Sequence, residues 1–158
     1  METMIRPMKR ADVPEIYRIE CVCFRSPWSK MSLYGELRND VAHYFVLTEG
    51  GKIAGYGGMW VVLDEAHVTN IAVLPEYRRR GYARRLMLQL MARALERGAS
   101  AMTLEVRENN LGAQQMYGQL GFSQNGYRPR YYEDTGEGAL LLWNTNLKAT
   151  VASAGKMW

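Results

Sequence analysis

The sequence lacks the features that would place the protein in a membrane or outside the cell. Its two longest apolar runs, at 59–63 and 139–143, have five residues each, whereas a membrane-spanning helix needs about 20. The N-terminus has no apolar stretch followed by a small-residue cleavage site, which a secretory signal would require. We therefore expect a cytoplasmic protein that has no membrane partner.

Cysteine and histidine are scarce, with two residues of each type. Cys21 and Cys23 are separated by a single residue, which would strain a disulfide between them, and we expect a reducing compartment. A structural zinc site needs about four ligands, and only His43 and His67 could join the cysteines. We predict no metal site, and we interpret both histidines as ordinary strand residues.

Extremes of composition are absent as well. Of the 158 residues, 47% are apolar and 23% are charged, which are ordinary values for a globular protein and exclude wholesale disorder. This length suits one domain with one core. We predict a single domain over residues 1–147 and a tail over 148–158 that frays, because its residues are small and polar.

Positive charge is concentrated in one segment. The net charge is +4, and once five clustered arginines are set aside, 15 basic residues face 16 acidic ones. A nucleic-acid-binding protein usually spreads its basic residues over a face or along a helix, whereas a tight cluster suits a compact anion such as phosphate. We expect no direct nucleic-acid partner. The cluster consists of Arg78, Arg79, Arg80, Arg84 and Arg85.

Apolar spacing predicts three main helices. The clearest spans 81–97, where apolar residues recur at helical spacing and Gly98 follows the last turn. Asp12 is expected to cap a helix that runs to about Cys21, paired with Glu15 as in a capping box. Ser29 is expected to cap a helix over 30–38.

The remaining segments predict strands and one more helix. That helix opens at 109–110 and ends at Gly121. Strands and helices do not alternate strictly, so the fold class is α+β rather than doubly wound. Pro7 argues for an edge position of the first strand, and the second to fourth strands form an antiparallel meander. The expected strands are 5–8, 42–49, 52–62, 65–74, 101–106, 122–132 and 137–147.

The segment before the longest helix has the properties of a phosphate site. A strand ends at Pro75, a helix starts at Gly81, and arginines lie between them. The N-terminus of a helix has unpaired backbone N–H groups and a partial positive charge, so it binds anions. Gly81 lets the backbone approach a ligand closely, and Ala83 leaves the first turn uncrowded. A solvated basic turn is the alternative interpretation.

Six segments together resemble the GNAT acetyltransferase superfamily, and in detail its RimI-like bacterial branch. They occur in family order over roughly residues 4–147. One of them, Arg78-x-x-Gly81-x-Ala83, is similar to the family's acyl-CoA loop. The other five are Pro27-Trp28-Ser29, the strand and its exit at 70–77, the strand end at 104–110, Ala113-x-x-x-Tyr117-x-x-x-Gly121-Phe122, and Arg128-x-x-Tyr131-Tyr132.

The resemblance implies a GNAT fold, with a mixed central sheet of about seven strands flanked by about four helices. It also implies an enzyme that transfers acetyl from acetyl-CoA, as co-substrate and without a metal, directly to the α-amino group of a protein. The RimI-like branch modifies the N-terminal alanine of the eighteenth protein of the small ribosomal subunit. A ribosomal protein is therefore the expected partner, and we expect a monomer or a weak homodimer.

The resemblance also implies two catalytic residues. Glu105 matches the family's general base and stands in an otherwise apolar strand, where an ionised group is costly unless it is used or paired. An α-amino group has a pKa of about 7.7 to 8.0, so the base has a modest task. Tyr117 matches the general acid, which returns a proton to the departing thiolate. The alternatives are a solvent-facing Glu105 and a Tyr117 packed in the core.

The resemblance implies cofactor binding at three places. Main-chain groups of a strand segment are expected to pair with the pantetheine arm, which is compatible with sheet-core side chains there. Asn110 is expected to bond the cofactor, with a helix N-cap as the alternative, and Asn109 is the other possible cap. The strand segment is Ile71, Ala72 and Val73, and the residues expected around the phosphates are Arg78, Arg79, Arg80, Gly81, Tyr82, Ala83 and Arg84.

Three aromatic residues are expected to bind the substrate N-terminus. Trp28 lies in one loop, and Tyr131 and Tyr132 lie in another, in the two loops that the family uses for this purpose. Aromatic residues in loops often serve recognition. The alternative is a satellite hydrophobic cluster beneath those loops.

Two other functions fit parts of the sequence. A GNAT enzyme could instead acylate lysine side chains, polyamines or aminoglycosides, although an amine with a pKa near 10.4 would depend far more on the base. A non-catalytic acyl-CoA-binding or nucleic-acid-associated module would keep the loop at 78–83 and lose Glu105 and Tyr117. Both residues are present, which favours the enzyme.

Overall fold

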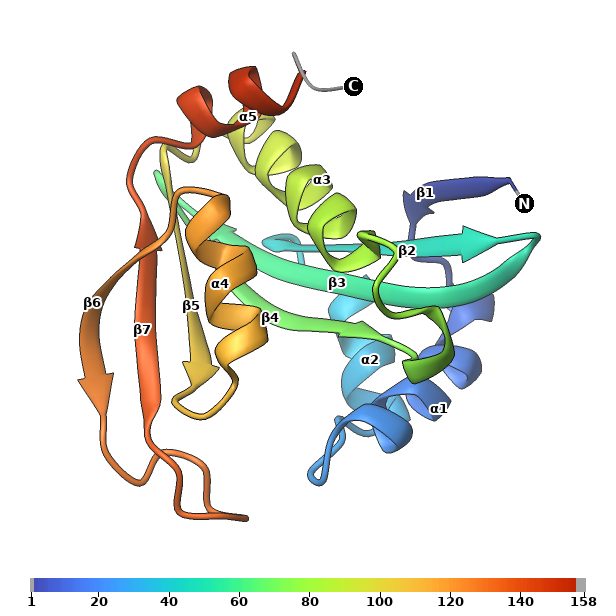
Figure 1. The fold of residues 1–158 in the computed structure, drawn as a ribbon. Helices are drawn as coiled ribbons and strands as arrows, with labels where there is room; N and C mark the ends of the chain where they lie inside the picture. Colours follow the sequence, from blue (N-terminus) through green and yellow to red (C-terminus); the bar gives the residue numbers. More distant parts are fainter. Residues whose placement is uncertain (1, 156–158) are drawn as a thin grey trace.

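One sheet of seven strands organises the protein (Figure 1). The computed structural model describes residues 2–155. The strand order is β1-β2-β3-β4-β5-β7-β6, and every neighbouring pair is antiparallel except β4 with β5. The strands are β1 (Thr3–Pro7), β2 (Ala42–Glu49), β3 (Lys52–Val62), β4 (Glu65–Val73), β5 (Ala101–Arg107), β6 (Ser123–Arg128) and β7 (Ala139–Asn144).

Helices cover both faces of this sheet (Figure 1). Helices α1 and α2 pack on one face, and α3, α4 and α5 lie on the other. Two short 3-10 turns complete the chain. The predicted α+β sheet of seven strands is confirmed, with five helices in place of about four. They are α1 (Val13–Cys23), α2 (Lys30–Leu37), α3 (Tyr82–Glu96), α4 (Leu111–Gln119) and α5 (Leu147–Gly155), and the turns are η1 (Arg10–Asp12) and η2 (Pro75–Tyr77).

Successive side chains of β2 point to opposite faces of the sheet, so this strand contributes residues to both hydrophobic cores. Phe45 and Leu47 are buried in the cluster under α3, whereas Tyr44 and Val46 are buried in the cluster under α1. Successive strand residues point to opposite faces, so one central strand can serve two cores. The predicted meander of β2, β3 and β4 is confirmed, and β1 lies at the sheet edge, as Pro7 predicts.

Asp12 corrects one local prediction. It precedes α1, but its carboxylate does not cap that helix. Its oxygens instead accept two hydrogen bonds from Arg6, at 2.7 and 2.9 Å, and one from the backbone N–H of Lys9, at 2.7 Å. The predicted pair with Glu15 is wrong because Glu15 binds Arg18 and because Asp12 already has helical backbone angles at the end of η1. Ser29 caps α2 as predicted.

The sheet splits between its two parallel strands. β4 and β5 pair only where Glu65–His67 faces Ala101–Thr103, and Figure 1 shows them diverging beyond that point. β4 also carries a bulge against β3, because Gly58 pairs with Asn70 while Met59 pairs with Val68. Thr69 is the extra residue. Bulges bend a strand and re-aim its groups, and this one lies where the strands part.

The C-terminal prediction is wrong for residues 148–155. They continue α5 from Leu147, and α5 packs against α3. Leu147 and Ala154 are buried in the main core, with Val151 packed beside them. The small apolar residues recur at helical spacing and find a partner surface on α3. Residues 156–158 of the predicted tail lie outside the described part of the chain.

The last two strands are shorter than predicted. β6 ends at Arg128 and β7 begins at Ala139, which leaves a ten-residue loop, 129–138, at one end of the pair. The predicted strand at 137–147 likewise stops at Asn144, before α5. Within residues 2–155, none of the helices combines the length and apolar character that crossing a bilayer demands.

Candidate active site

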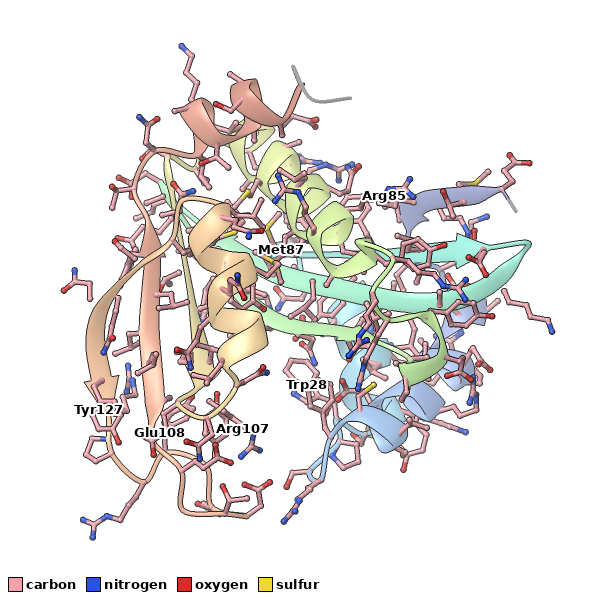
Figure 2. All side chains as sticks on the ribbon, in the orientation of Figure 1. Trp28, Arg85, Met87, Arg107, Glu108 and Tyr127 are labelled. Carbon is pink, nitrogen blue, oxygen red and sulfur yellow. The ribbon has the colours of Figure 1, made fainter. Side chains whose placement is uncertain are left out.

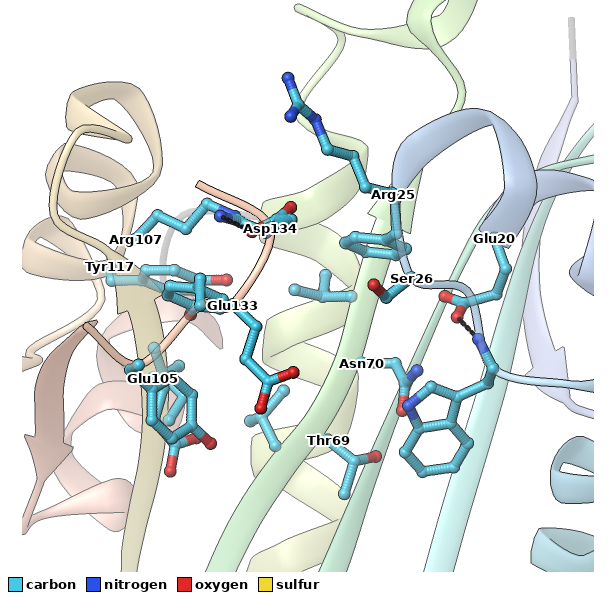
Figure 3. A pocket seen from close by; sticks show the side chains of 17 residues that line it. Glu20, Arg25, Ser26, Thr69, Asn70, Glu105, Arg107, Tyr117, Glu133 and Asp134 are labelled. Carbon is cyan, nitrogen blue, oxygen red and sulfur yellow. Dashed lines mark hydrogen bonds and ion pairs between the residues drawn. The ribbon is translucent and has the colours of Figure 1, made fainter. Parts of the chain in front are cut away.

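A pocket of about 420 Å³ lies where β4 and β5 separate (Figure 3). Its walls come from the two strands, from the end of α1 and the loop after it, from α4, and from the 129–138 loop. The structure thus brings together residues that are far apart in sequence. The predicted site residues that line it are Trp28, Ile71, Glu105, Tyr117, Tyr131 and Tyr132.

Glu105 reaches the pocket because successive side chains of β5 point to opposite faces of the sheet. Leu104 and Val106 are buried in the core under α3, so Glu105 points to the opposite face, where its side chain is 16% exposed. Its Oε2 lies 2.8 Å from Nε2 of His67 on β4. Burial acts to raise the pKa of Glu105, but the hydrogen bond and charge of His67, together with Arg128, lower it below its usual value of 4.5. Glu105 is therefore a carboxylate at neutral pH.

His67 corrects the prediction that both histidines are ordinary strand residues. His43 lies in β2, as expected, whereas His67 lies in the strand and also contacts Glu105. The hydrogen bond with Glu105 raises the pKa of His67 above 6.5, against the opposite effects of burial and of Arg128. No local pattern marks this contact, since it joins two strands that lie 38 residues apart.

Tyr117 belongs to the core and to the pocket at once. It lies on α4, is 5% exposed, and packs edge-on against Phe122 with ring centroids 5.7 Å apart. Figure 3 shows its hydroxyl directed into the pocket on the same side as Glu105. Burial, with a smaller effect of Tyr132, raises the pKa of Tyr117. The hydroxyl therefore keeps its proton at neutral pH, as a general acid must.

Glu20 is a buried carboxylate that the sequence interpretation missed. It lies on α1, is 1% exposed and lines the pocket. Its Oε1 accepts a hydrogen bond from the backbone N–H of Trp28 at 2.8 Å, and its Oε2 accepts one from the Tyr56 hydroxyl. Glu20 stands four residues after Ile16 on the apolar face of α1, and a carboxylate at such a position is the signal that could have found it.

The same network reaches the bulge of β4. Asn70 donates to the Tyr56 hydroxyl at 3.3 Å and accepts from the Tyr44 hydroxyl at 3.0 Å, and that hydroxyl also lies 2.8 Å from the hydroxyl of Thr69. Buried polar networks fix geometry when every member is satisfied. This one connects Trp28 in the α1–α2 loop to the bulged segment of β4.

The 129–138 loop forms the wall opposite Trp28. The rings of Tyr131 and Tyr132 pack edge to face with centroids 5.1 Å apart. Arg107 at the end of β5 places its guanidinium 4.0 Å from the centre of the Tyr132 ring and bonds Asp134. Figure 2 shows Trp28 and Arg107 on opposite sides of the gap between the two halves of the sheet. Both predicted substrate loops therefore border one pocket.

The segment between β4 and α3 leads into a helix N-terminus, as predicted, and two of its residues have left-handed backbone angles. Gly81 precedes α3 with φ +77°, and Arg79 has φ +65°. Gly81 has no side chain to cap the helix, so the first N–H groups of α3 remain available for an anion. Such a turn of backbone N–H groups is a typical anion-binding concavity.

Several loop side chains bind the protein itself. Arg80 reaches Glu49 of β2 at 2.6 Å, and the Tyr82 hydroxyl also donates to Glu49. Arg78 donates from Nε to the carbonyl of Val73 at 3.1 Å. Tyr82 is buried, so only its main chain can serve a ligand.

The other predicted cofactor residues lie outside the pocket wall. Ala72 and Val73 are buried on opposite sides of β4 in the two cores. Asn110 caps α4, because its side-chain oxygen accepts from the N–H of Ala113 at 3.1 Å, which is the alternative that the sequence left open. In the described part of the chain, no three His, Cys, Asp or Glu side chains gather in a way that could hold a metal ion.

Comparisons with known proteins agree with this architecture. The model of the acetyltransferase (GNAT) family matches residues 13–122. A Bacillus subtilis protein, provisionally named as a ribosomal protein bS18-alanine N-acetyltransferase, is 42% identical over 142 residues, which are 89% of this chain and 94% of that protein. The Escherichia coli K12 protein of that name is 37% identical over 131 residues, covering 83% and 88% of the two chains.

A solved structure is similar throughout. The crystal structure of the ribosomal-protein-S18-alanine N-acetyltransferase from Escherichia coli matches with a TM-score of 0.83 and 35% identity, over 90% of this chain and 92% of that one. The chain belongs to the GNAT acetyltransferase family. It is an acetyl-CoA-dependent N-acetyltransferase, and its likeness to the bS18-alanine enzymes confirms the predicted resemblance to the RimI-like branch.

Proposed function

We propose that this enzyme acetylates the α-amino group of an N-terminal alanine, and that its substrate is ribosomal protein bS18. One observation carries the proposal. Glu105 and Tyr117 face one pocket between two aromatic-bearing loops, so a base, an acid and an acceptor site meet at the split in the sheet. The relatives that share at least a third of the sequence over most of their length carry that activity in their names.

Glu105 acts as the general base. Its carboxylate is ionised at neutral pH, and His67 occupies Oε2, which leaves Oε1 to accept a proton from the amine, directly or through one water. A carboxylate is a weak base, but an α-amino group is already partly neutral at pH 7 because its pKa is about 7.7 to 8.0. Glu105 therefore needs to remove a proton only from the amine molecules that are still charged, or from the amine as it attacks.

Tyr117 acts as the general acid. Its hydroxyl holds a proton because burial raises its pKa, and it opens onto the same pocket as Glu105. A thiol has a pKa near 8.5 and a tyrosine near 10, so Tyr117 can protonate a departing thiolate only if it is held close. Packing against Phe122 holds the ring in place.

Acetyl-CoA supplies the acetyl group as a reactive thioester. The residues present fit it, because the uncapped N-terminus of α3 and the left-handed backbone at Arg79 and Gly81 form a cradle of N–H groups. Arg79, Arg84 and main-chain N–H groups from Arg80 to Ala83 would hold its phosphates. The main chain of Ile71, Ala72 and Val73 would pair with its extended arm, and Asn110 has its amide nitrogen left for a further contact.

Trp28, Tyr131 and Tyr132 bind the acceptor N-terminus in this proposal. They border the pocket from two loops on opposite sides, so an extended peptide can enter between them. Aromatic side chains supply large contact area at low entropic cost. The amine would then lie between these loops, within reach of Glu105.

The test uses one peptide that begins with alanine and carries an internal lysine. The enzyme is incubated with this peptide and acetyl-CoA, and fragmentation mass spectrometry locates the added acetyl group. We expect acetyl on the α-amino group, and we expect Glu105→Gln to reduce kcat by about 10²-fold while acetyl-CoA still binds. Acetyl on the lysine side chain would contradict the proposal, and unchanged kcat in Glu105→Gln would remove Glu105 from its role.

The substrate itself is tested by competition between peptides. One peptide carries the N-terminal sequence of bS18 and the other carries the same residues in scrambled order after the first alanine. A higher kcat/KM for the bS18 peptide supports bS18 as the substrate. Equal values would assign the enzyme to N-terminal alanines in general.

A further inference from the structure

The guanidinium of Arg107 joins β5, the strand that carries Glu105, to the 129–138 loop by several contacts at once. Its two terminal nitrogens donate to both oxygens of Asp134, at 3.1 and 2.9 Å (Figure 3). One of them also reaches Thr135 at 3.3 Å and Glu137 at 3.4 Å. The group stacks on Tyr132, 4.0 Å from the ring centre. Arg107 stands two residues after Glu105 on β5, so these contacts hold the loop against the strand that carries the proposed base.

The segment 132–137 is a turn closed by its own hydrogen bonds. Tyr132 donates its N–H to the carbonyl of Glu137 at 3.0 Å and accepts from Gly136 at 2.8 Å. Glu137 in turn bonds Thr135 through its side chain and its backbone N–H. Because the turn is bonded internally, the contacts of Arg107 fix the position of the whole turn.

A second anchor, Glu108, holds the two ends of the loop rather than the part that borders the pocket. Glu108, the next residue after β5, accepts from the N–H of Gly138 at 3.0 Å and from the Tyr127 hydroxyl at 2.7 Å. Figure 2 shows Tyr127, Glu108 and Arg107 at the same end of the sheet. Loss of Glu108 would loosen the start of β7, whereas loss of Arg107 would release the part of the loop that borders the pocket.

We propose that Arg107 is a positioning residue for the acceptor: it latches segment 131–137 over the pocket and so places Tyr131 and Tyr132 where the N-terminus of the substrate binds. This inference rests on the proposed function. A planar guanidinium can bind a carboxylate with two parallel bonds and stack on a ring at the same time, which lysine cannot do. The side chain of Arg107 is 32% exposed, so a substitution there leaves no large cavity in the core.

The latch makes a specific kinetic prediction. We expect Arg107→Ala to raise KM for the alanine peptide by about 10-fold or more, because the segment that carries Tyr131 and Tyr132 loses four hydrogen bonds and a stacked guanidinium. KM for acetyl-CoA should change by less than about twofold, since the side chain of Arg107 contacts the 129–138 loop and not the loop at 78–83. Arg107→Lys keeps the charge and should still raise KM for the peptide.

A double-mutant cycle with Asp134 isolates the latch from a general effect on folding. Asp134→Asn alone should raise KM for the peptide, and adding it to Arg107→Ala should have little further effect, because the two residues act through one contact. Arg130→Gln is the matched control, since it removes one positive charge from the same loop. It should leave both KM values unchanged.

Hydrogen exchange tests the latch without activity. In Arg107→Ala, amides at 131–137 should exchange faster while those of β4 and α3 keep the rates of the wild type. Unchanged exchange at 131–137 would overturn the latch, and so would faster exchange with no change in KM for the peptide. If the wild type fails to acetylate the α-amine, the proposed function fails, and hydrogen exchange still shows whether Arg107 holds the loop.

Discussion

Nε2 of His67 lies 2.8 Å from Oε2 of Glu105, two residues beyond Thr103, the last residue of β5 that pairs with β4. The side chain of His67 is 42% exposed and that of Glu105 is 16% exposed, so the pair joins the pocket to solvent. The histidine holds one carboxylate oxygen and leaves the other for the substrate. It also lowers the pKa of Glu105, against the effect of burial. The proposed base is therefore coupled to a histidine whose own pKa is raised by the same contact.

Removal of His67 should move the acid limb of the pH–rate profile. The acid limb of kcat/KM reports the pKa of the free enzyme's essential base. His67→Ala removes a hydrogen bond and a positive charge that lower the pKa of Glu105, so the limb should move to higher pH. The other groups that act electrostatically on Glu105 or respond to it are the guanidinium of Arg128 on β6 and the neutral hydroxyl of Tyr132 in the 129–138 loop. The check is a kcat/KM profile measured with the alanine peptide from pH 4 upward.

Two further variants separate the possible causes of that shift. His67→Gln can keep the hydrogen bond without the charge and should move the limb by a smaller amount. His43→Gln changes the other histidine, in β2, and should leave the limb in place. An acid limb that is the same in His67→Ala and in the wild type would show that Glu105 is not the group that titrates.

The same pair should stabilise the fold in a defined pH window. Glu105 has a lowered pKa, so its contribution is present above its usual value of 4.5 and is lost as the pH falls through the folded-state value. His67 has a raised pKa, so its contribution is present below 6.5 and is lost as the pH rises through the folded-state value. The difference in Tm between the wild type and His67→Ala should be largest between these pH values. Thermal melts across the range would show it, and a constant difference would contradict it.

Tyr117→Phe should impair the reaction while leaving the fold intact. The substitution removes only the hydroxyl, and the ring keeps its contact with Phe122. Without a donor for the departing thiolate, kcat should fall by about 10²-fold, with little change in Tm. Tyr127→Phe is the control, because it removes a hydroxyl that bonds Glu108 outside the pocket. Normal turnover by Tyr117→Phe would leave Tyr117 as a core residue only.

Gly81→Ala should weaken acetyl-CoA binding. Gly81 has φ +77°, and a Cβ built there meets no atom within 4 Å, so the penalty comes from the left-handed backbone alone, at about 1 to 2 kcal/mol. This strain disfavours the backbone conformation of the turn whose N–H groups would hold the phosphates. KM for acetyl-CoA should therefore rise. Gly98→Ala, at the other end of α3 with φ +92° and equally open space, should lower Tm similarly and leave KM unchanged. Equal effects of both variants on KM would exclude the cradle.

Leu147→Ala should destabilise the protein through α5. Leu147 is fully buried in the main core, and truncation of a buried leucine costs about 2 to 5 kcal/mol. Lys148→Ala changes the neighbouring exposed residue and should stay within about 0.5 kcal/mol. Urea titrations of the two variants give both free energies of unfolding. Equal values would mean that α5 does not stabilise the core.

The sequence was most informative where a local pattern decides the structure. The periodic apolar face of α3, the glycines at its two ends and the proline in β1 each predict their element, and the structure confirms all of them. Asp12 shows the limit of such patterns, because a neighbouring arginine competes for the carboxylate. The residues after Leu147 show another limit, since they form a helix only because α3 offers a surface to cover.

The individual residues of the site could be predicted from the sequence, whereas the contacts between them could not. Family resemblance led to Glu105, Tyr117 and the aromatic loops, and the structure places them around one pocket. The contacts of His67 and Arg107 join segments that are 38 and 27 residues apart, and no spacing along the chain reports such proximity. Arg80 and Tyr82 match the family loop, yet Glu49 on a distant strand holds their side chains.

The split between β4 and β5 also affects the behaviour of the protein in a crowded cell. Unpaired strand edges at the rim of a sheet invite strands of other molecules and lead to aggregation. Here β4 and β5 part after three paired positions, so their unpaired edges lie inside the sheet, beneath α4 and two loops. An extended ligand, as proposed for the acyl-CoA arm, would enter there, and the walls of the pocket leave less room for a second folded sheet. On the proposed function, the split would keep backbone groups available for a narrow ligand while limiting their contact with neighbouring molecules.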